Sequence, residues 1–125
     1  MKIDIISISV EIKEISAYCK EAYNEKDGDG MSERITKLNS YLARSSELLS
    51  SAWYFLNVKR GEVSERLHKE NDKLAPTKLK ELMAGDLAQE ESTYKLCERI
   101  NRTITHQIEG LRSQLSFIKE QFKNH

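Results

Sequence analysis

The feature that most constrains this chain is the spacing of its apolar residues, which recur every three or four positions over long stretches. In the first segment the spacing is that of a helix face, through Ile5, Ile8, Ile12, Ile15, Cys19 and Ala22. One proline and five glycines are spread over 125 residues, so few positions break such helices. The stretch from Ile3 to Val10 also fits a strand, but the three-four spacing runs through it and predicts a helix over about residues 4–25.

A second apolar stripe predicts a helix over about residues 32–74. Its members are Ile35, Leu38, Leu42, Ser45, Leu49, Ala52, Leu56, Val63, Leu67 and Leu74. Two Asp-Gly pairs in the segment 24–30 have turn chemistry, and Ser32 is the expected N-cap after them. Pro76 ends this helix near Leu74, because a proline disfavours helical geometry in the residue before it.

The most regular stripe predicts a last helix over about residues 87–122, after a short helix near 77–84. Its members are Tyr94, Cys97, Ile100, Ile104, Ile108, Leu111, Leu115, Ile118 and Phe122. Gly61 and Gly110 lie inside the long helices, where a glycine marks a kink or a close helix contact. The sequence therefore predicts an all-α chain, a single helical domain over residues 1–125 built from three long amphipathic helices and a short one.

The lengths of these helices predict a homo-oligomer. A helix over residues 87–122 is about 50 Å long at 1.5 Å per residue. A globule of this chain length has a radius of gyration of only about 14 Å. Apolar stripe is then left over at the helix ends, and we expect a second copy to cover it.

Charge is balanced over the whole chain but not along it. The formal net charge is 0, which argues against a strongly basic nucleic-acid binder. Residues 1–33 nevertheless carry four basic and eight acidic side chains, whereas residues 93–125 carry six and three. Either the two ends pack together, within or between chains, or the basic end meets a phosphate-bearing partner.

Cys19 and Cys97 lie far apart and on apolar faces, which predicts free, buried thiols and a cytoplasmic protein. Asp4 and Glu11 interrupt the apolar start of the chain, so a signal peptide is not expected there. No stretch reaches the roughly 18 apolar residues of a membrane span, and no membrane partner is expected.

Familiar catalytic, cofactor and metal motifs are absent from the sequence. The acidic run Glu25, Asp27 and Asp29 resembles the start of a calcium loop, but Thr36 stands where the bidentate glutamate belongs, and a solvated turn is the simpler interpretation. The histidines have no metal-ligand spacing. We therefore expect no resident cofactor and no catalytic residues, and an enzyme is the least favoured class.

Basic residues of the last helix are the strongest candidates for a ligand site. The predicted phosphate-binding set is Lys59, Arg60, Lys95, Arg99, Arg102, His106 and Arg112. Trp53 and Tyr54 are candidates for stacking on a base, beside a cluster of serines at positions 45, 46, 50 and 51. The alternatives are a solvated helix face for the basic set and close helix packing for the serines.

The C-terminal run ITHQIEGLRSQLSFIKEQ resembles the end of small helical accessory proteins of phages and prophages. The aromatic-then-basic run from Trp53 to Arg60, followed by a long last helix, also resembles the layout of phage recombination mediators of the UvsY type. That resemblance implies an oligomeric, non-enzymatic protein that assists recombination on single-stranded DNA.

Three functional hypotheses follow from the sequence. The first is a recombination accessory protein whose basic last helix contacts single-stranded DNA. The second is a viral counter-defence protein that sequesters a small nucleotide between the helices of an oligomer, through Arg99, Arg102 and the Trp53–Tyr54 region. The third is a structural module whose apolar stripes bind a helix of a protein partner.

Overall fold

The computed structural model describes residues 3–24, 27–71 and 73–123, and within these ranges the chain is helical without strands. Its helices are α1 (Ile5–Cys19), α2 (Gly28–Glu70), α3 (Pro76–Asp86) and α4 (Ala88–Lys123). The predicted all-α class is confirmed, and the strand alternative for the first segment is wrong, because α1 buries Ile8, Ile12 and Ile15 on one helical face.

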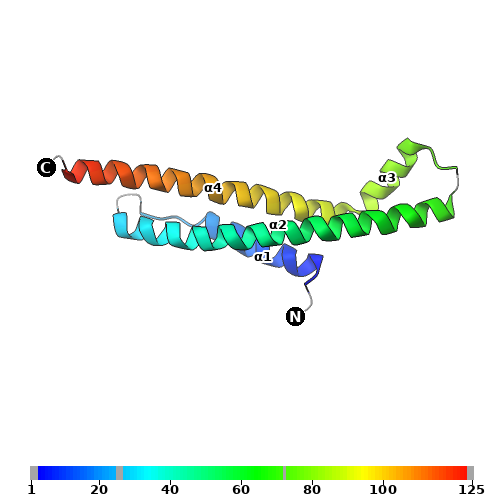
Figure 1. Ribbon diagram of the computed structural model, residues 1–125, viewed down its shortest axis with the longest axis horizontal. Coiled ribbons are helices and arrows are strands. Elements are labelled where there is room, and N and C mark those ends of the chain that lie inside the picture. Colours follow the sequence, from blue (N-terminus) through cyan, green and yellow to red (C-terminus); the bar gives the residue numbers. More distant parts are fainter. Residues whose placement is uncertain (1–2, 25–26, 72, 124–125) are drawn as a thin grey trace.

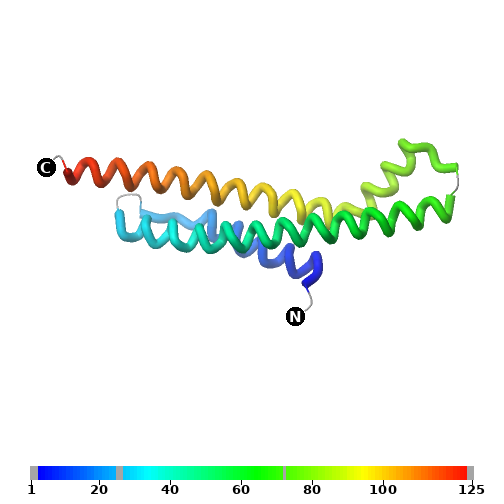
Figure 2. The backbone as a smooth tube through the Cα atoms, in the orientation of Figure 1, coloured from blue at the N-terminus to red at the C-terminus, as the bar shows by residue number. Residues whose placement is uncertain are grey.

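The two long helices form an antiparallel hairpin that gives the molecule its elongated shape (Figure 1). Helices α2 and α4 pack side by side, and the short α3 connects them at one end (Figure 2). Leu38, Ala52, Cys97 and Ile104 are fully buried along their shared seam. The long helices thus bury their stripes chiefly against each other, as apolar faces do when water is excluded from between them.

Helix α1 packs across one half of this hairpin and completes a three-helix core. Its buried isoleucines lie in one apolar cluster with residues of α2 and α4, Met31, Leu38 and Ile104 among them. We call this part the α1 half. In the α3 half, a smaller cluster consists of Leu56, Val63, Leu67 and Leu87, against which α3 places partly buried side chains and no fully buried one.

The end of α1 differs from the prediction, which placed it near residue 25. The helix ends at Cys19, and Ala22, predicted to be on its buried face, is exposed. Two residues from the other helices bind the last carbonyl groups. Gln107 Nε2 donates to the carbonyl oxygen of Cys19 at 2.9 Å, and Arg34 Nη2 donates to that of Tyr18 at 3.2 Å. These tertiary contacts therefore end the helix, and the chain continues from there to the start of α2.

Arg34 is buried, and its surroundings explain why a cation is tolerated there. The guanidinium carbon lies 4.8 Å from the ring centroids of both Tyr18 and Tyr23. It also sits at the C-terminal end of α1, where the helix dipole favours a positive charge. Arg34 thereby links α1, the following segment and α2.

The start of α2 also differs from the prediction, which used Ser32 as the N-cap. The helix begins at Gly28 after the N-cap Asp27, so the second Asp-Gly pair lies in its first turn rather than in a loop. Burial of Met31 in the core explains the earlier start. With Asp29 and Gly30 in the helix, a calcium loop is not formed by them; Glu25 lies outside the described residues.

The far ends of α2 and α3 lie close to their predicted positions. Helix α2 ends at Glu70 rather than Leu74, and Leu74 instead packs from the connecting segment onto the Leu56–Val63–Leu67 cluster. Pro76 is the first residue of α3, a position that suits proline because its missing amide hydrogen is not needed there.

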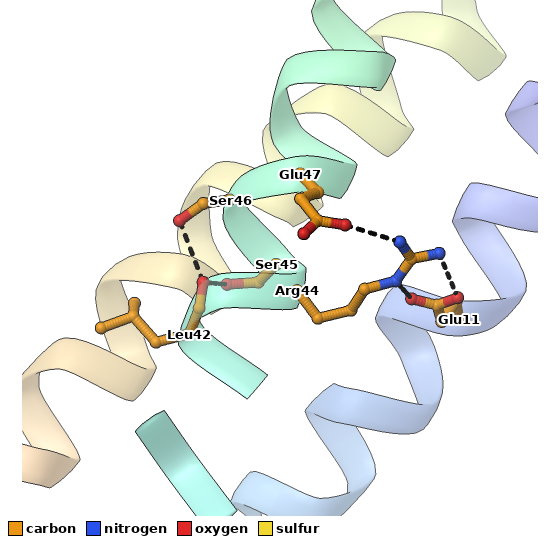
Figure 3. Close-up of polar contacts among 6 residues, drawn as sticks. All are labelled: Glu11, Leu42, Arg44, Ser45, Ser46 and Glu47. Atoms are coloured by element: carbon orange, nitrogen blue, oxygen red, sulfur yellow. Dashed lines mark hydrogen bonds and ion pairs between the residues drawn. The ribbon is translucent and has the colours of Figure 1, made fainter. Parts of the chain in front are cut away.

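Polar contacts fix the register of the helices. Arg44 of α2 reaches Glu11 of α1 and, at 2.8 Å, Glu47 on its own helix (Figure 3). Asn101 of α4 donates to the hydroxyl oxygens of Ser45 and Ser46, each at 2.9 Å. These two serines are therefore helix-packing residues, and their bonds accommodate the polar Asn101 within the apolar stripe of α4.

Contact between the acidic first segment and the basic last helix is made by apolar packing and hydrogen bonds rather than by ion pairs. Helices α1 and α4 share the core of the α1 half. Yet in the described ranges no ion pair joins residues 3–33 to residues 93–123. Among the described residues, no helix is long and apolar enough to cross a membrane.

Candidate functional site

The basic side chains predicted on the last helix fall on different sides of α4. At 100° per residue, Lys95, Arg99, Arg102 and His106 lie within an arc of about 60°. All four are exposed. Arg112 follows Arg99 by thirteen residues and Arg102 by ten, rotations that place it about 140° from Arg99 and about 80° from Arg102. The structure thus separates Arg112 from the rest of the predicted set.

Two adjoining hollows lie on this side of α4. The larger, of about 480 Å³, is lined by Ala84, Ala88, Glu91, Ser92, Lys95, Leu96 and Arg99. The smaller, of about 250 Å³, is lined by Ser16, Cys19, Lys20, Arg99, Ile100, Thr103 and Gln107. Arg99 lines both, so this residue borders a groove along α4 on one side and a recess beside the end of α1 on the other.

Three cations, Lys20, Lys95 and Arg99, make up what we call the α4 cationic surface. None of them has an ion pair within the ranges that the structure describes. Charges that are free of internal partners are available to an anion without first breaking a contact. Glu91 lines the same groove, but Arg60 lies 3.7 Å from its carboxylate and balances its charge.

Arg102 and His106 are less available than their neighbours. Glu98 lies 3.2 Å from Arg102 one turn away on α4, and Glu109 lies 3.9 Å from His106. These pairs are exposed and weak, on the order of 0.5 kcal/mol each. Arg102 can supplement the α4 cationic surface but must share its charge with Glu98, and the His106 ring likewise lies beside a carboxylate.

Sequence reasoning missed Lys20 and the contact that Gln107 makes with the end of α1. Lys20 directly follows α1, and only the packing of α1 against α4 brings it beside Arg99. Gln107 uses its amide nitrogen on Cys19, which leaves its side-chain oxygen buried and without a partner among the described atoms. Nothing in the sequence indicates that Gln107 makes this hydrogen bond, because its partner is a backbone carbonyl far away in the chain.

Residues predicted to stack on a base lie elsewhere. Trp53 lines a hollow of about 260 Å³ with Ser46, Leu49, Ser50 and Tyr94. Tyr54 lines another, of about 350 Å³, with Ile3, Ser50, Ser51 and Phe55. Neither hollow includes Arg99 or Arg102, so the nucleotide pocket predicted from these residues is not assembled in the hollows of one chain.

Lys59 and Arg60 are exposed on α2, outside the hollows that contain Arg99. Arg60 contacts Asn57 at 3.2 Å in addition to Glu91. Lys59 has no ion pair in the described residues. Of the predicted set, the structure therefore brings together Lys95 and Arg99, flanked by Arg102 and His106.

Both cysteine thiols are held in an unreactive state. Burial raises the pKa of the Cys97 thiol to about 11, and burial also raises the pKa of Cys19, against the opposing charge of Arg34. Both cysteines are free and buried, as predicted. Because the thiolate is the nucleophile, these thiols are poorly suited to attack a substrate near neutral pH. The described residues contain no cluster that could hold a metal ion.

Comparisons with known proteins add no family to this description. No family model matches the chain, and neither the curated proteins nor the solved structures searched include a match. The interpretation of the site therefore depends on its own geometry and charge.

Proposed function

We propose that the protein is a non-enzymatic accessory protein that binds the phosphate backbone of single-stranded DNA along the α4 cationic surface. The observation that carries the proposal is the meeting of Lys20, Lys95 and Arg99 at two adjoining hollows, with none of these charges used in an ion pair in the described residues. The phage recombination setting implied by the sequence resemblance is part of this proposal.

Geometry of the surface suits a flexible polyanion. Lys95 and Arg99 are one helical turn apart, about 6 Å along the axis. Lys20, which directly follows α1, lines the smaller hollow with Arg99, so the three cations are spread over two adjoining hollows rather than gathered around one point. Exposed cations in a row bind a backbone through counterion release, which gives affinity without reading the sequence of the bases.

Salt dependence of DNA binding tests the proposal. We expect a labelled oligothymidine to bind at low salt, with a slope of log K against log salt of about −2 for three phosphate contacts. The double substitution Lys95→Gln and Arg99→Gln should weaken binding at least ten-fold and reduce the slope to about −0.7. Fluorescence anisotropy over a salt series measures both quantities.

A matched control removes the same number of charges elsewhere. Lys59→Gln with Arg112→Gln changes the net charge equally but leaves the α4 cationic surface intact. This control should keep the slope and most of the affinity of the wild-type chain. Absence of binding at low salt, or an equal loss in the control, contradicts the proposal.

A small nucleotide is the second candidate ligand, and the size of the larger hollow favours it. Its volume of about 480 Å³ falls within the range of small-molecule sites. Binding of a cyclic dinucleotide or an ADP-ribose derivative should raise the melting temperature. At a ligand concentration a hundred times Kd, the free energy of unfolding should rise by about 2.7 kcal/mol. That increase should disappear in the Lys95–Arg99 double variant, and its absence from the wild-type chain argues against this candidate.

A further inference from the structure

Phe117 is a large apolar side chain that lies outside both apolar clusters of the bundle. It belongs to the last turns of α4, which extend past the first residues of α2 (Figure 1). Leu115 still packs against the core, but Phe117 follows it by two residues and therefore points to nearly the opposite side. Phe117 is 63% exposed as a result. Single exposed apolar residues are common on protein surfaces, so the features that lie beside Phe117 decide its meaning.

Phe117 lies on the same line along α4 as Arg99. The two residues are eighteen positions apart, which is about five complete turns and about 27 Å along the helix axis. From Arg99 to Phe117, the residues within about 40° of this direction make up what we call the Arg99–Phe117 strip: Arg99, Thr103, His106, Gly110, Ser113 and Phe117. All are exposed except Thr103, which is partly buried. The α4 cationic surface therefore continues as an open strip as far as Phe117.

The glutamates of α4 lie to the sides of the strip. Each of them is about 60° or more from the direction of Arg99; they are Glu90, Glu91, Glu98, Glu109 and Glu120. Glu109 contacts the edge of the strip, 3.9 Å from His106. Lys95, by contrast, precedes Arg99 by one turn and lies within about 40° of it. A polyanion on the strip thus meets cations at one end, and no glutamate of α4 lies directly beneath it.

Gly110, between the cations and Phe117, is not required by packing within the chain. A Cβ atom added at Gly110 meets nothing within 4 Å in the described part of the chain. Glycine also destabilises the interior of a helix relative to alanine. With the small Ser113 beside it, Gly110 leaves the middle of the strip low, so that a ligand held by the cations can lie close to the helix on its way to Phe117.

We propose that Phe117 stacks on a base of single-stranded DNA whose phosphates lie on Lys95 and Arg99, so that the strand runs along the Arg99–Phe117 strip. This inference rests on the proposed function and adds a contact to the bases, which the α4 cationic surface alone does not provide. An aromatic ring stacks on the face of any base, so the contact raises affinity without selecting a sequence. Trp53 and Tyr54 do not fill this role, because their hollows contain neither Lys95 nor Arg99.

The length of the strip sets the size of the binding site. At 3.4 Å per stacked nucleotide, about eight nucleotides cover the roughly 27 Å from Arg99 to Phe117. A more extended strand covers the same distance with fewer nucleotides. Other proteins that bind single strands have sites of about 4–16 nucleotides per domain. An oligothymidine of about twelve nucleotides is therefore long enough to reach both ends of the strip.

Removal of the aromatic ring tests the contact. In fluorescence anisotropy with this oligothymidine, Phe117→Ala should weaken binding about 5- to 100-fold, whereas Phe117→Trp should bind as tightly as the wild-type chain. The slope of log K against log salt should keep its wild-type value, because stacking releases no counterions. Phe122→Ala is the matched control, since Phe122 is 78% exposed in the same turns of α4 but lies about 140° away from the strip.

An abasic strand of the same length separates stacking from any other role of Phe117. It offers the same phosphates without bases, so the wild-type chain and Phe117→Ala should bind it equally. Equal binding of oligothymidine by these two chains, an equal loss in Phe122→Ala, or a lower oligomer mass of Phe117→Ala in light scattering overturns the inference. If the Lys95–Arg99 double variant loses affinity and Phe117→Ala does not, only this inference fails. If the wild-type chain binds no DNA at low salt, the phosphate-binding proposal fails with it.

Discussion

In the α1 half of the bundle three helices enclose fully buried side chains, whereas in the α3 half the same two long helices share a smaller core with a short third helix. The most buried side chains of the first, such as Ile12, Leu38 and Ile104, are 0% exposed, whereas no member of the smaller cluster in the second is less than 2% exposed. Helix α3 adds no fully buried residue. The comparison teaches that the hairpin stripes need a third apolar face to be sealed completely, and that α1 provides it better than α3 does.

The largest expected difference between the halves comes from cavities in their cores. Ile104→Ala should lower the free energy of unfolding by about 3–4 kcal/mol, because the sealed α1 half cannot relax into the space. Leu67→Ala should cost about 2 kcal/mol, since α3 can move into the smaller core. Chemical denaturation followed by circular dichroism measures both values. Equal losses would mean that the two cores are equally well sealed.

Arg34 bonds α1 to the hairpin. Its replacement should therefore loosen the packing of α1, so that the α1 half is sealed less completely, as the α3 half is. Arg34→Met keeps much of the side-chain volume but loses the bonds to the carbonyl oxygens of Tyr18 and Cys19. We expect a loss of about 1–2 kcal/mol in the free energy of unfolding, from charged hydrogen bonds and the helix dipole. Hydrogen exchange should quicken in α1 but not in α3; uniform acceleration would show that Arg34 acts on the whole bundle.

Gly110 offers a way to strengthen the α1 half. A Cβ atom added at this position meets nothing within 4 Å, so the close helix contact predicted there is not made within the chain. Gly110→Ala should therefore raise the free energy of unfolding by about 0.5–1 kcal/mol through its helix propensity. Thermal denaturation at a fixed protein concentration detects the gain. A loss of stability instead would reveal a contact between copies at this glycine.

The smallest expected effect concerns the ion pair between α1 and α2. Arg44 holds the pKa of Glu11 below its ordinary value of 4.5, chiefly through a side-chain hydrogen bond. A lowered carboxyl pKa contributes stability above that ordinary value, and the contribution is lost as the pH falls through the folded-state pKa. Because both side chains are partly exposed, Glu11→Gln should cost only about 0.2–1 kcal/mol at pH 7.

Two measurements of unfolding, at pH 7 and near pH 3, test this sign. The difference between the wild-type chain and the Glu11→Gln variant should be present at neutral pH and should shrink in acid. Glu47→Gln is the matched control, since Glu47 contacts Arg44 within α2 and does not join the helices. If the difference in unfolding free energy between the wild-type chain and Glu11→Gln is larger near pH 3 than at pH 7, Glu11 acts through something other than its charge.

Much of the candidate site could be predicted from the sequence, because helical periodicity groups its residues on one face. The spacing of Lys95, Arg99, Arg102 and His106 places them on one face of any regular helix. They are exposed because the apolar stripe on the other side of α4 is the part of the helix that packs into the core. Lys20 could not be assigned to that face, because its place depends on where α1 ends and on which neighbour it meets.

Taken alone, the sequence determined the helices and their buried faces, because the three-four spacing of apolar residues is a local property of the chain. Only the tertiary structure decided where the helices end and which of them meet. Gln107 and Arg34 end α1 from a distance, and burial of Met31 draws the start of α2 forward. The physical reason is that helix ends have unsatisfied backbone groups, and their partners come from whichever segments pack beside them.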